Sequence, residues 1–122
     1  MRGHEFRIKR VYEAPSREDG FRVLVDRLWP RGLAKARAEL DLWCKEVAPG
    51  PELRTWWDHD PARAEEFAAR YRAELGANPA LGELAGTASA HRVTTLLYAA
   101  RDPELNHARV LRDVLEEAED AR

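Results

Sequence analysis

The pattern of hydrophobic and polar positions predicts four strands. Residues 6–12 carry a short alternation with a period of two, which is typical of a half-buried strand. Residues 21–25 and 92–100 are mainly apolar runs that predict buried strands, and the first of them is halted at Asp26. Residues 40–47 alternate well enough for a further strand, with a short helix as the alternative.

Helical spacing of apolar residues and helix start signals predict helices between these strands. Asp60-Pro61 combines an N-cap residue with proline at the first helical position, and the same pair recurs at Asp102-Pro103. The first pair is predicted to open a helix that ends near residues 76–78, and the second a helix that runs to about Ala118. Their inward faces are predicted to carry Phe67, Tyr71 and Leu75 in the first helix and Leu111, Val114 and Leu115 in the second. Shorter helical segments are expected at 34–39, 52–57 and 79–84, with a loop at 86–90.

Strands interleaved with helices predict an α/β fold: a small, mostly parallel sheet of about four strands with helices packed on its faces. The 122 residues carry no repeat or linker, so we expect one domain over residues 1–122. The formal net charge of −2 argues against a nucleic-acid-binding protein, which needs a basic face. The polar N-terminus, the lack of an apolar run long enough to span a membrane and the lone Cys44 predict a cytoplasmic protein without disulfides.

The first candidate site follows the strand at 21–25. Ligands of open α/β sheets bind beyond the carboxyl ends of strands, where Asp26 is followed by Arg27, Trp29 and Arg31 in a loop broken by proline and glycine. The arginines are candidates to bind an anion, Trp29 to stack on a ring and Asp26 to accept a proton. The alternative is a buried Asp–Arg pair that stabilises the loop, with Trp29 in the core.

The second candidate site lies at the end of the strand at 92–100 and the start of the last helix. It contains Tyr98, Arg101, Asn106 and His107, and helical spacing points His107 toward the sheet. If the two buried strands are parallel neighbours, both candidate sites share one crevice, with His107 as the imidazole for acid–base chemistry. The alternative is an Asn106–His107 pair that only fixes the start of the helix.

We expect no metal site and no cofactor. Residues 56–60 contain Asp58, His59 and Asp60, but consecutive residues do not face one ion on a regular backbone, so His59 is interpreted as a surface residue. Cys44 has no neighbouring base or second cysteine and is interpreted as an inert thiol. The glycines fit neither a dinucleotide-binding nor a P-loop spacing.

The chain resembles a known family at these same residues. The similarity runs from about Phe6 to Leu115, and its most specific part is the run Asp26-Arg27-Leu28-Trp29-Pro30-Arg31-Gly32. Further matching runs are Lys9 to Tyr12, Leu53-Arg54, Tyr71 to Leu75, Thr95 to Asp102 and Asn106-His107-Ala108. On these motifs the chain is similar to the YeaO-like branch of domain-of-unknown-function family 488, which implies an intracellular α/β domain without an assigned reaction.

The longer branch of that family differs at the second candidate site. It has a cysteine where this chain has Tyr98, and a Cys-His-Arg run where this chain has Asn106-His107-Ala108. The resemblance therefore implies no thiol or metal chemistry here. It leaves His107 and Asp26-Arg27 as shared elements, which favours a functional His107.

Three functions follow as hypotheses. The favoured one is an enzyme or ligand-binding domain for a small anionic, phosphate- or nucleotide-like molecule, held by Arg27, Arg31 and Arg101, with Asp26 and His107 for proton transfer. In this hypothesis Trp29 or Tyr98 stacks on the ligand, and Asn106 belongs to the same binding site. The alternatives are a nucleic-acid-binding regulator and an interaction module or homodimer that uses exposed aromatic residues such as Trp56 and Trp57.

Overall fold

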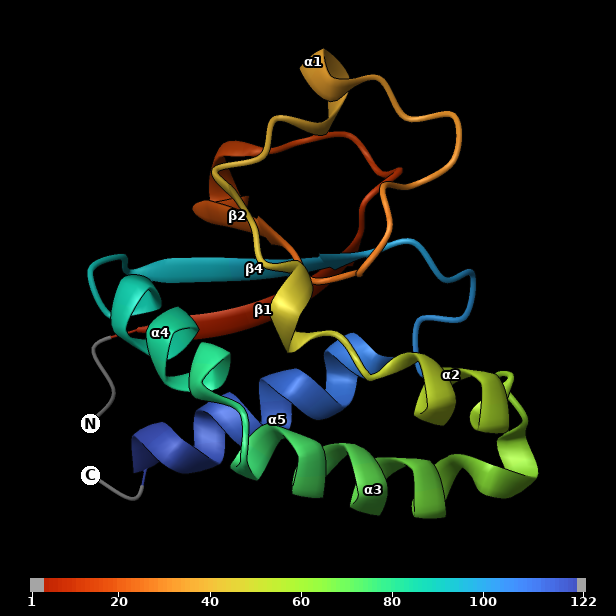
Figure 1. Ribbon diagram of the computed structural model, residues 1–122. Helices are drawn as coiled ribbons and strands as arrows, with labels where there is room; N and C mark the ends of the chain where they lie inside the picture. The colour runs from red at the N-terminus through yellow and green to blue at the C-terminus, as the bar shows by residue number, and fades with distance from the viewer. Residues whose placement is uncertain (1–3, 121–122) are drawn as a thin grey trace.

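A sheet of four parallel strands forms the centre of the molecule. The computed structural model describes residues 4–120. The strands lie in the order β1-β4-β2-β3, and every pair is parallel (Figure 1). Their bounds are β1 (Glu5–Arg10), β2 (Phe21–Leu24), β3 (Leu42–Trp43) and β4 (Val93–Tyr98). The α/β class and the parallel sheet predicted from the sequence are confirmed.

The two central strands are those with apolar runs. In β2 and β4 the neighbouring residues Val23 and Leu96, and Leu24 and Leu97, pair across the sheet and are fully buried. A strand that is covered on both faces needs apolar side chains at consecutive positions, which explains why these runs do not alternate. The parallel pairing brings the carboxyl ends of β2 and β4 to the same edge of the sheet.

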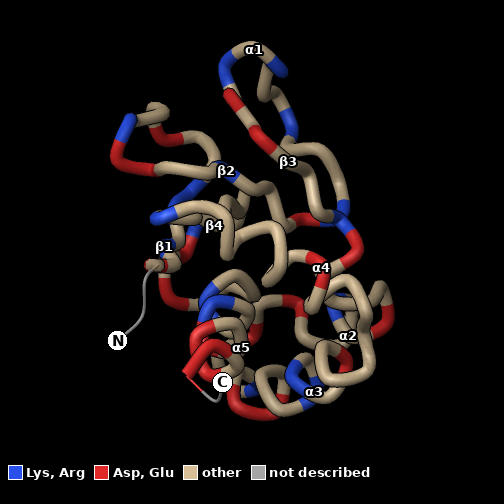
Figure 2. The backbone as a smooth tube through the Cα atoms, turned by 90° about the vertical axis from the view of Figure 1, so that its left-hand side faces the viewer, with Lys and Arg blue, Asp and Glu red and all other residues tan. Residues whose placement is uncertain are grey.

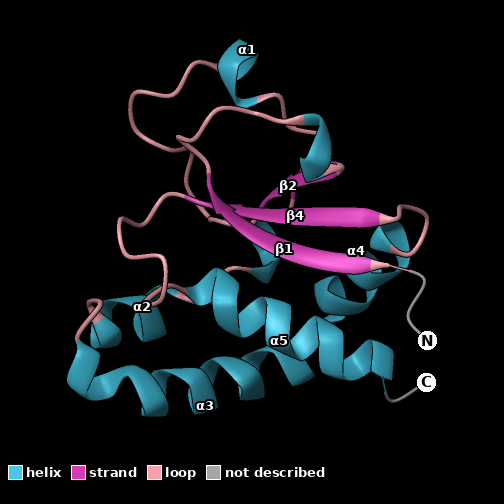
Figure 3. Ribbon diagram, turned by 180° about the vertical axis from the view of Figure 1, so that it is seen from behind, coloured by secondary structure: helices cyan, strands magenta, loops and turns pink. Residues whose placement is uncertain are grey.

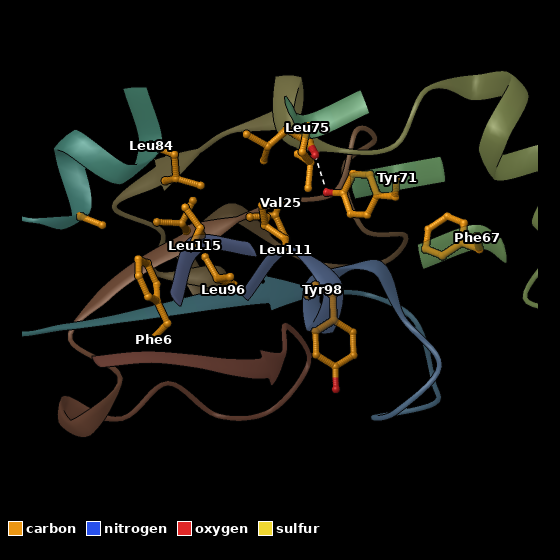
Figure 4. Packing of buried hydrophobic residues seen from close by; sticks show 14 of the residues in the cluster. Phe6, Val25, Phe67, Tyr71, Leu75, Leu84, Leu96, Tyr98, Leu111 and Leu115 are labelled. Atoms are coloured by element: carbon orange, nitrogen blue, oxygen red, sulfur yellow. Dashed lines mark hydrogen bonds between the residues drawn. The ribbon is translucent and has the colours of Figure 1, made fainter. Parts of the chain in front are cut away.

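The longer helices cover one face of the sheet (Figures 1 and 3). They are α2 (Pro51–Trp57), α3 (Ala64–Gly76), α4 (Pro79–Ala88) and α5 (His107–Asp120). Their inward residues form the main core, in which Tyr71, Leu84 and Leu111 lie among the side chains of the sheet (Figure 4). Among residues 4–120, no helix is long and apolar enough to cross a membrane; the cytoplasmic location stays a prediction.

Connecting segments, rather than long helices, cover the opposite face. Three-residue helical turns occur at Arg17–Asp19 (η1), Lys45–Val47 (η2) and Pro61–Arg63 (η3), and Val47 of η2 belongs to the main core. The segment between β2 and β3, which covers the opposite face, includes only the short helix α1 (Lys35–Ala38). On this face a second core forms around Val11, Leu24 and Leu97, against which Trp29 and Trp43 pack.

Two of the predicted helix boundaries were wrong, each for a local reason. Helix α4 continues through the expected loop at 86–90 as far as Ala88, because Leu84 and Ala88 are four residues apart and both are buried. Helix α5 begins at His107 and not at Asp102-Pro103. The carboxylate of Asp102 accepts hydrogen bonds from the amides of Glu104 and Leu105 and so closes a separate turn.

The segment at 40–47 combines both alternatives. A two-residue strand pairs with the end of β2, and the turn η2 follows directly. The first strand is also shorter than predicted and ends at Arg10, although the amide of Val11 still donates to the carbonyl of Tyr98.

Candidate functional site

The ends of β2 and β4 and the start of α5 meet at one point, as the sequence interpretation required. His107 is the first residue of α5, and its Nε2 lies 3.3 Å from Oδ1 of Asp26. The same nitrogen lies 3.0 Å from the carbonyl oxygen of Val25, the residue directly after β2. A carbonyl oxygen only accepts, so Nε2 carries a hydrogen in this arrangement.

Backbone and aromatic contacts hold this pair rigidly. The amide of Ala99, just beyond β4, donates to Oδ2 of Asp26 over 3.0 Å, and the indole of Trp43 donates to the Asp26 carbonyl over 2.8 Å. The ring of Tyr71 meets the His107 ring edge-on, with 6.1 Å between centroids. Each ring or carboxylate in the pair is therefore fixed by at least one neighbour from a different element.

Burial governs the charge of both members of the pair. Removal from water raises the pKa of Asp26 above its ordinary value, while the His107 charge and the Ala99 amide lower it to a smaller extent. Removal from water likewise lowers the pKa of His107, against the attraction of Asp26. The site thus favours the neutral form of each group over an isolated buried charge.

A cleft of about 300 Å³ opens beside this pair. Its walls come from the loop after β2, the segment before α2, the end of α2 and the residues after β4. The lining residues are Asp26, Arg27, Leu28, Ala48, Pro49, Arg54, Trp57, His59, Ala99, Ala100 and His107. Arginines outnumber carboxylates in this lining by two to one, so the cleft is positively charged even when Asp26 is ionised.

Neither arginine of the cleft forms an ion pair with a carboxylate of residues 4–120. Arg27 is half-buried and donates from Nη2 to the Ala48 carbonyl over 3.2 Å, while its buried Nε has no hydrogen-bond partner in the described part of the chain. Arg54 is exposed on α2, and no hydrogen bond or ion pair of its guanidinium group occurs within residues 4–120. Both groups therefore keep donors for an anion.

The sequence interpretation did not include Arg54 among the site residues. His59 is exposed, as predicted, and it also lines the cleft. Leu53 and Trp57 form the buried face of α2. Arg54, the next residue after Leu53, is exposed and lines the cleft. Asp58 and His59 both have left-handed backbone conformations, with φ of 46° and 54°, and this turn lays the His59 ring 4.7 Å from Trp57. Only the match of Leu53-Arg54 to the family pattern indicated this wall of the cleft.

Several residues predicted for the site are absent from the lining of the cleft. The residues concerned are Trp29, Arg31, Tyr98, Arg101 and Asn106. Trp29 lies against the opposite face of the sheet, where its indole donates to the Leu33 carbonyl and its ring meets Trp43 edge-on. Arg31 and Arg101 are exposed outside the cleft, and the carbonyl of Arg31 accepts the hydroxyl of Tyr12.

Asn106 and Tyr98 have structural surroundings. Oδ1 of Asn106 accepts the amide of Arg109 over 3.0 Å, which is the N-cap interaction of α5, and its amide group donates to the Asp102 carbonyl. Tyr98 is buried in the main core, and its hydroxyl is directed away from Tyr71 (Figure 4). Asn106 therefore fixes the start of the helix, as the alternative interpretation proposed for this residue.

The remaining candidate chemistry also has a structural explanation. Within residues 4–120, no three His, Cys, Asp or Glu side chains gather as a metal site would require. The ring of Trp56 packs beneath the guanidinium groups of Arg63 and Arg70, at 5.2 and 4.3 Å from its centroid. Burial raises the pKa of the Cys44 thiol, which disfavours a reactive thiolate.

Comparisons with known proteins assign the chain to a family. A family model described as the inactive DUF488-N3 subclade matches residues 5–122. The chain belongs to the DUF488 family. This DUF488 protein is 44% identical over 115 residues to the uncharacterized protein Rv3073c of Mycobacterium tuberculosis H37Rv, covering 94% of this chain and 97% of the relative. It is 41% identical over 107 residues to the uncharacterized protein YeaO of Escherichia coli K12, covering 88% and 93% of the two chains.

These relatives confirm the YeaO-like branch that the sequence motifs indicated. No solved structure matches this DUF488 protein. The relatives carry no named ligand or reaction, so the chemistry of the cleft itself is the basis for a functional proposal.

Proposed function

We propose that this DUF488 protein is a binding domain for a small anionic, phosphate-like molecule, which lies in the cleft at the carboxyl ends of β2 and β4. The observation that supports the proposal is the pair of guanidinium groups, Arg27 and Arg54, that line one cleft and form no ion pair with a carboxylate in the described part of the chain. Guanidinium groups bind phosphate with two parallel hydrogen bonds, which favours anions of this shape.

The Asp26–His107 pair shapes the cleft in this proposal and does not drive a reaction. His107 Nε2 is engaged by the Val25 carbonyl, and Oδ2 of Asp26 by the Ala99 amide, so one polar atom of each side chain is tied to the backbone. Oδ1 of Asp26 has no hydrogen-bond partner in the described residues and lies 3.3 Å from His107 Nε2. The matching subclade is described as inactive, which also favours binding without turnover. Proton transfer by Asp26 and His107 stays a prediction of the sequence.

A small ligand is favoured over a nucleic acid by the distribution of charge. Lys and Arg residues are interspersed with Asp and Glu along the elements of the fold (Figure 2). A nucleic-acid-binding face needs several basic residues without intervening acids, because each acid opposes contact with the phosphate backbone. The cleft itself combines two arginines with one carboxylate, which suits a small anion.

The proposal is tested by titrating the protein with inorganic phosphate and measuring the dissociation constant by calorimetry. Arg54→Gln removes one positive charge from the cleft and is expected to weaken phosphate binding about fivefold to tenfold, in line with about 1–1.5 kcal/mol for an exposed charged hydrogen bond. Arg54 is exposed and makes no ion pair in the described residues, so the free energy of unfolding should stay unchanged.

Arg101→Gln is the matched control. Arg101 is equally exposed, lies near the same end of the sheet and was a candidate from the sequence, yet it does not line the cleft. Its replacement should leave phosphate affinity unchanged. Equal losses in the two variants would indicate a diffuse electrostatic effect in place of a site, and an absence of phosphate binding to the wild-type protein would refute the proposal.

A further inference from the structure

The wall of the cleft is only partly basic. Beside the arginines and histidines, it includes a set of apolar residues: Leu28, Ala48, Pro49, Trp57, Ala99 and Ala100. A bare phosphate ion gains nothing from apolar surface, because each of its oxygens seeks a hydrogen-bond donor. The composition of this wall therefore fits a ligand that has an apolar part as well as an anionic one.

Leu28 is the most informative of these residues. In the described part of the chain, two large hydrophobic residues are exposed, Tyr12 at 39% and Leu28 at 65%. Leu28, the more exposed of the two, also lines the cleft. Its neighbours are held on both sides: Arg27 donates to the Ala48 carbonyl, Trp29 donates to the Leu33 carbonyl and Pro30 is buried. The loop thus keeps the Leu28 side chain in water, next to the cleft, where a bound apolar group would cover it.

The size of the cleft limits the ligand. A volume of about 300 Å³ stands at the lower end of the range for sites that take small organic molecules, and it exceeds what a phosphate group alone would fill. The space beyond the phosphate suits a short alkyl chain or a single ring.

We propose that the ligand is a small organic phosphomonoester, with its phosphate at Arg27 and Arg54 and its carbon portion against Leu28. This inference rests on the proposed function, because the phosphate group is the part that the arginines hold. Leu28 is then a residue that determines specificity: it distinguishes an organic phosphate from inorganic phosphate.

The test compares dissociation constants for inorganic phosphate and for methyl, ethyl, propyl and butyl phosphate, measured by calorimetry on the wild-type protein and on Leu28→Ala. Burial of one methylene group contributes about 0.8 kcal/mol, which corresponds to roughly a fourfold gain in affinity, and partial cover reduces this to about twofold. We expect a gain of about twofold to fourfold for each added carbon in the wild-type protein. Leu28→Ala should lose most of that gain and keep its affinity for inorganic phosphate.

Leu81→Ala is the control for the loss of leucine surface elsewhere. Leu81 is half-buried on α4 and lies outside the cleft, so its replacement should leave the whole affinity series unchanged. Leu28 is exposed, so its variant is expected to remain folded, and thermal unfolding of both variants checks this directly.

The outcomes separate the two proposals. Affinity that rises along the series and flattens in Leu28→Ala supports the inference. Binding of inorganic phosphate with no gain from added carbons, or an equal loss for every ligand in Leu28→Ala, overturns the inference and leaves the proposed function standing. Absence of binding for every ligand, inorganic phosphate included, overturns both.

Discussion

The hydroxyl of Tyr71 links helix α3 to Val47, the residue before the wall of the cleft at Ala48 and Pro49, so its removal should destabilise the fold by a measurable amount. Tyr71 is fully buried, and its hydroxyl donates to the carbonyl of Val47, which is also fully buried (Figure 4). In Tyr71→Phe that carbonyl loses its partner in a place that water does not reach, and an unsatisfied buried carbonyl costs about 1–3 kcal/mol. We expect the free energy of unfolding to fall by about 2 kcal/mol, or the melting temperature by roughly 6–10 °C for a chain of this length.

Urea unfolding followed by circular dichroism measures this difference, provided that the slope with denaturant is the same in both proteins. Tyr98→Phe is the matched control, because Tyr98 is also buried but its hydroxyl makes no hydrogen bond with any residue from 4 to 120. Its replacement should change the free energy of unfolding by less than about 0.5 kcal/mol. If the two substitutions lower the free energy of unfolding equally, the hydrogen bond to Val47 is not the cause, and the reasoning is refuted.

Four further predictions concern the same fold. Burial raises the pKa of Asp26 above 3.8, so the free energy of unfolding should fall as the pH rises through the pKa of Asp26 in the folded protein. Asp26→Asn should abolish this fall when unfolding is measured from pH 4 to 8. Burial lowers the pKa of His107 below 6.5, so the stabilisation of the fold by neutral His107 is lost as the pH falls below 6.5. His107→Gln should abolish this decrease in the free energy of unfolding at low pH. Asn106→Ala should lower the free energy of unfolding by about 1–2 kcal/mol through loss of the α5 N-cap, and Asn106→Asp should restore most of it; equal stability of all three proteins would contradict the cap. Gly20→Ala should reduce soluble, folded protein as judged by circular dichroism, because Gly20 has φ of 64° and an added Cβ would lie 2.4 Å from the Val93 carbonyl oxygen; wild-type stability would contradict this.

The local pattern of the sequence was sufficient for the main elements. The apolar runs at 21–25 and 92–100 identify the central strands, since only a strand covered on both faces needs consecutive apolar residues. The position of Asp26 directly after such a run also indicated the edge of the sheet at which the cleft lies. The positions of these strands and of Asp26 depend on the order of adjacent residues, which can be read directly from the sequence.

Helix boundaries were less well determined, because competing local signals had to be resolved. Asp102-Pro103 and Asn106 are both valid start signals, and the helix begins after the second, where His107 can reach Val25 and Asp26. Propensity alone does not rank two caps that lie four residues apart.

Asp26, Arg27 and His107 were predicted from the sequence and line the cleft, but which further side chains join them was decided by the tertiary structure. Trp29 and Arg54 both have side chains suited to a ligand, yet Trp29 lies on the far face of the sheet and Arg54 arrives from α2, far along the chain. Trp29 lies in the loop after β2, whose path over the sheet decides which face the side chain meets, and a helix approaches the site at an angle set by its packing. The sequence by itself therefore determined the edge at which a site forms, while the packing of α2 and α5 against the sheet decided which side chains surround it.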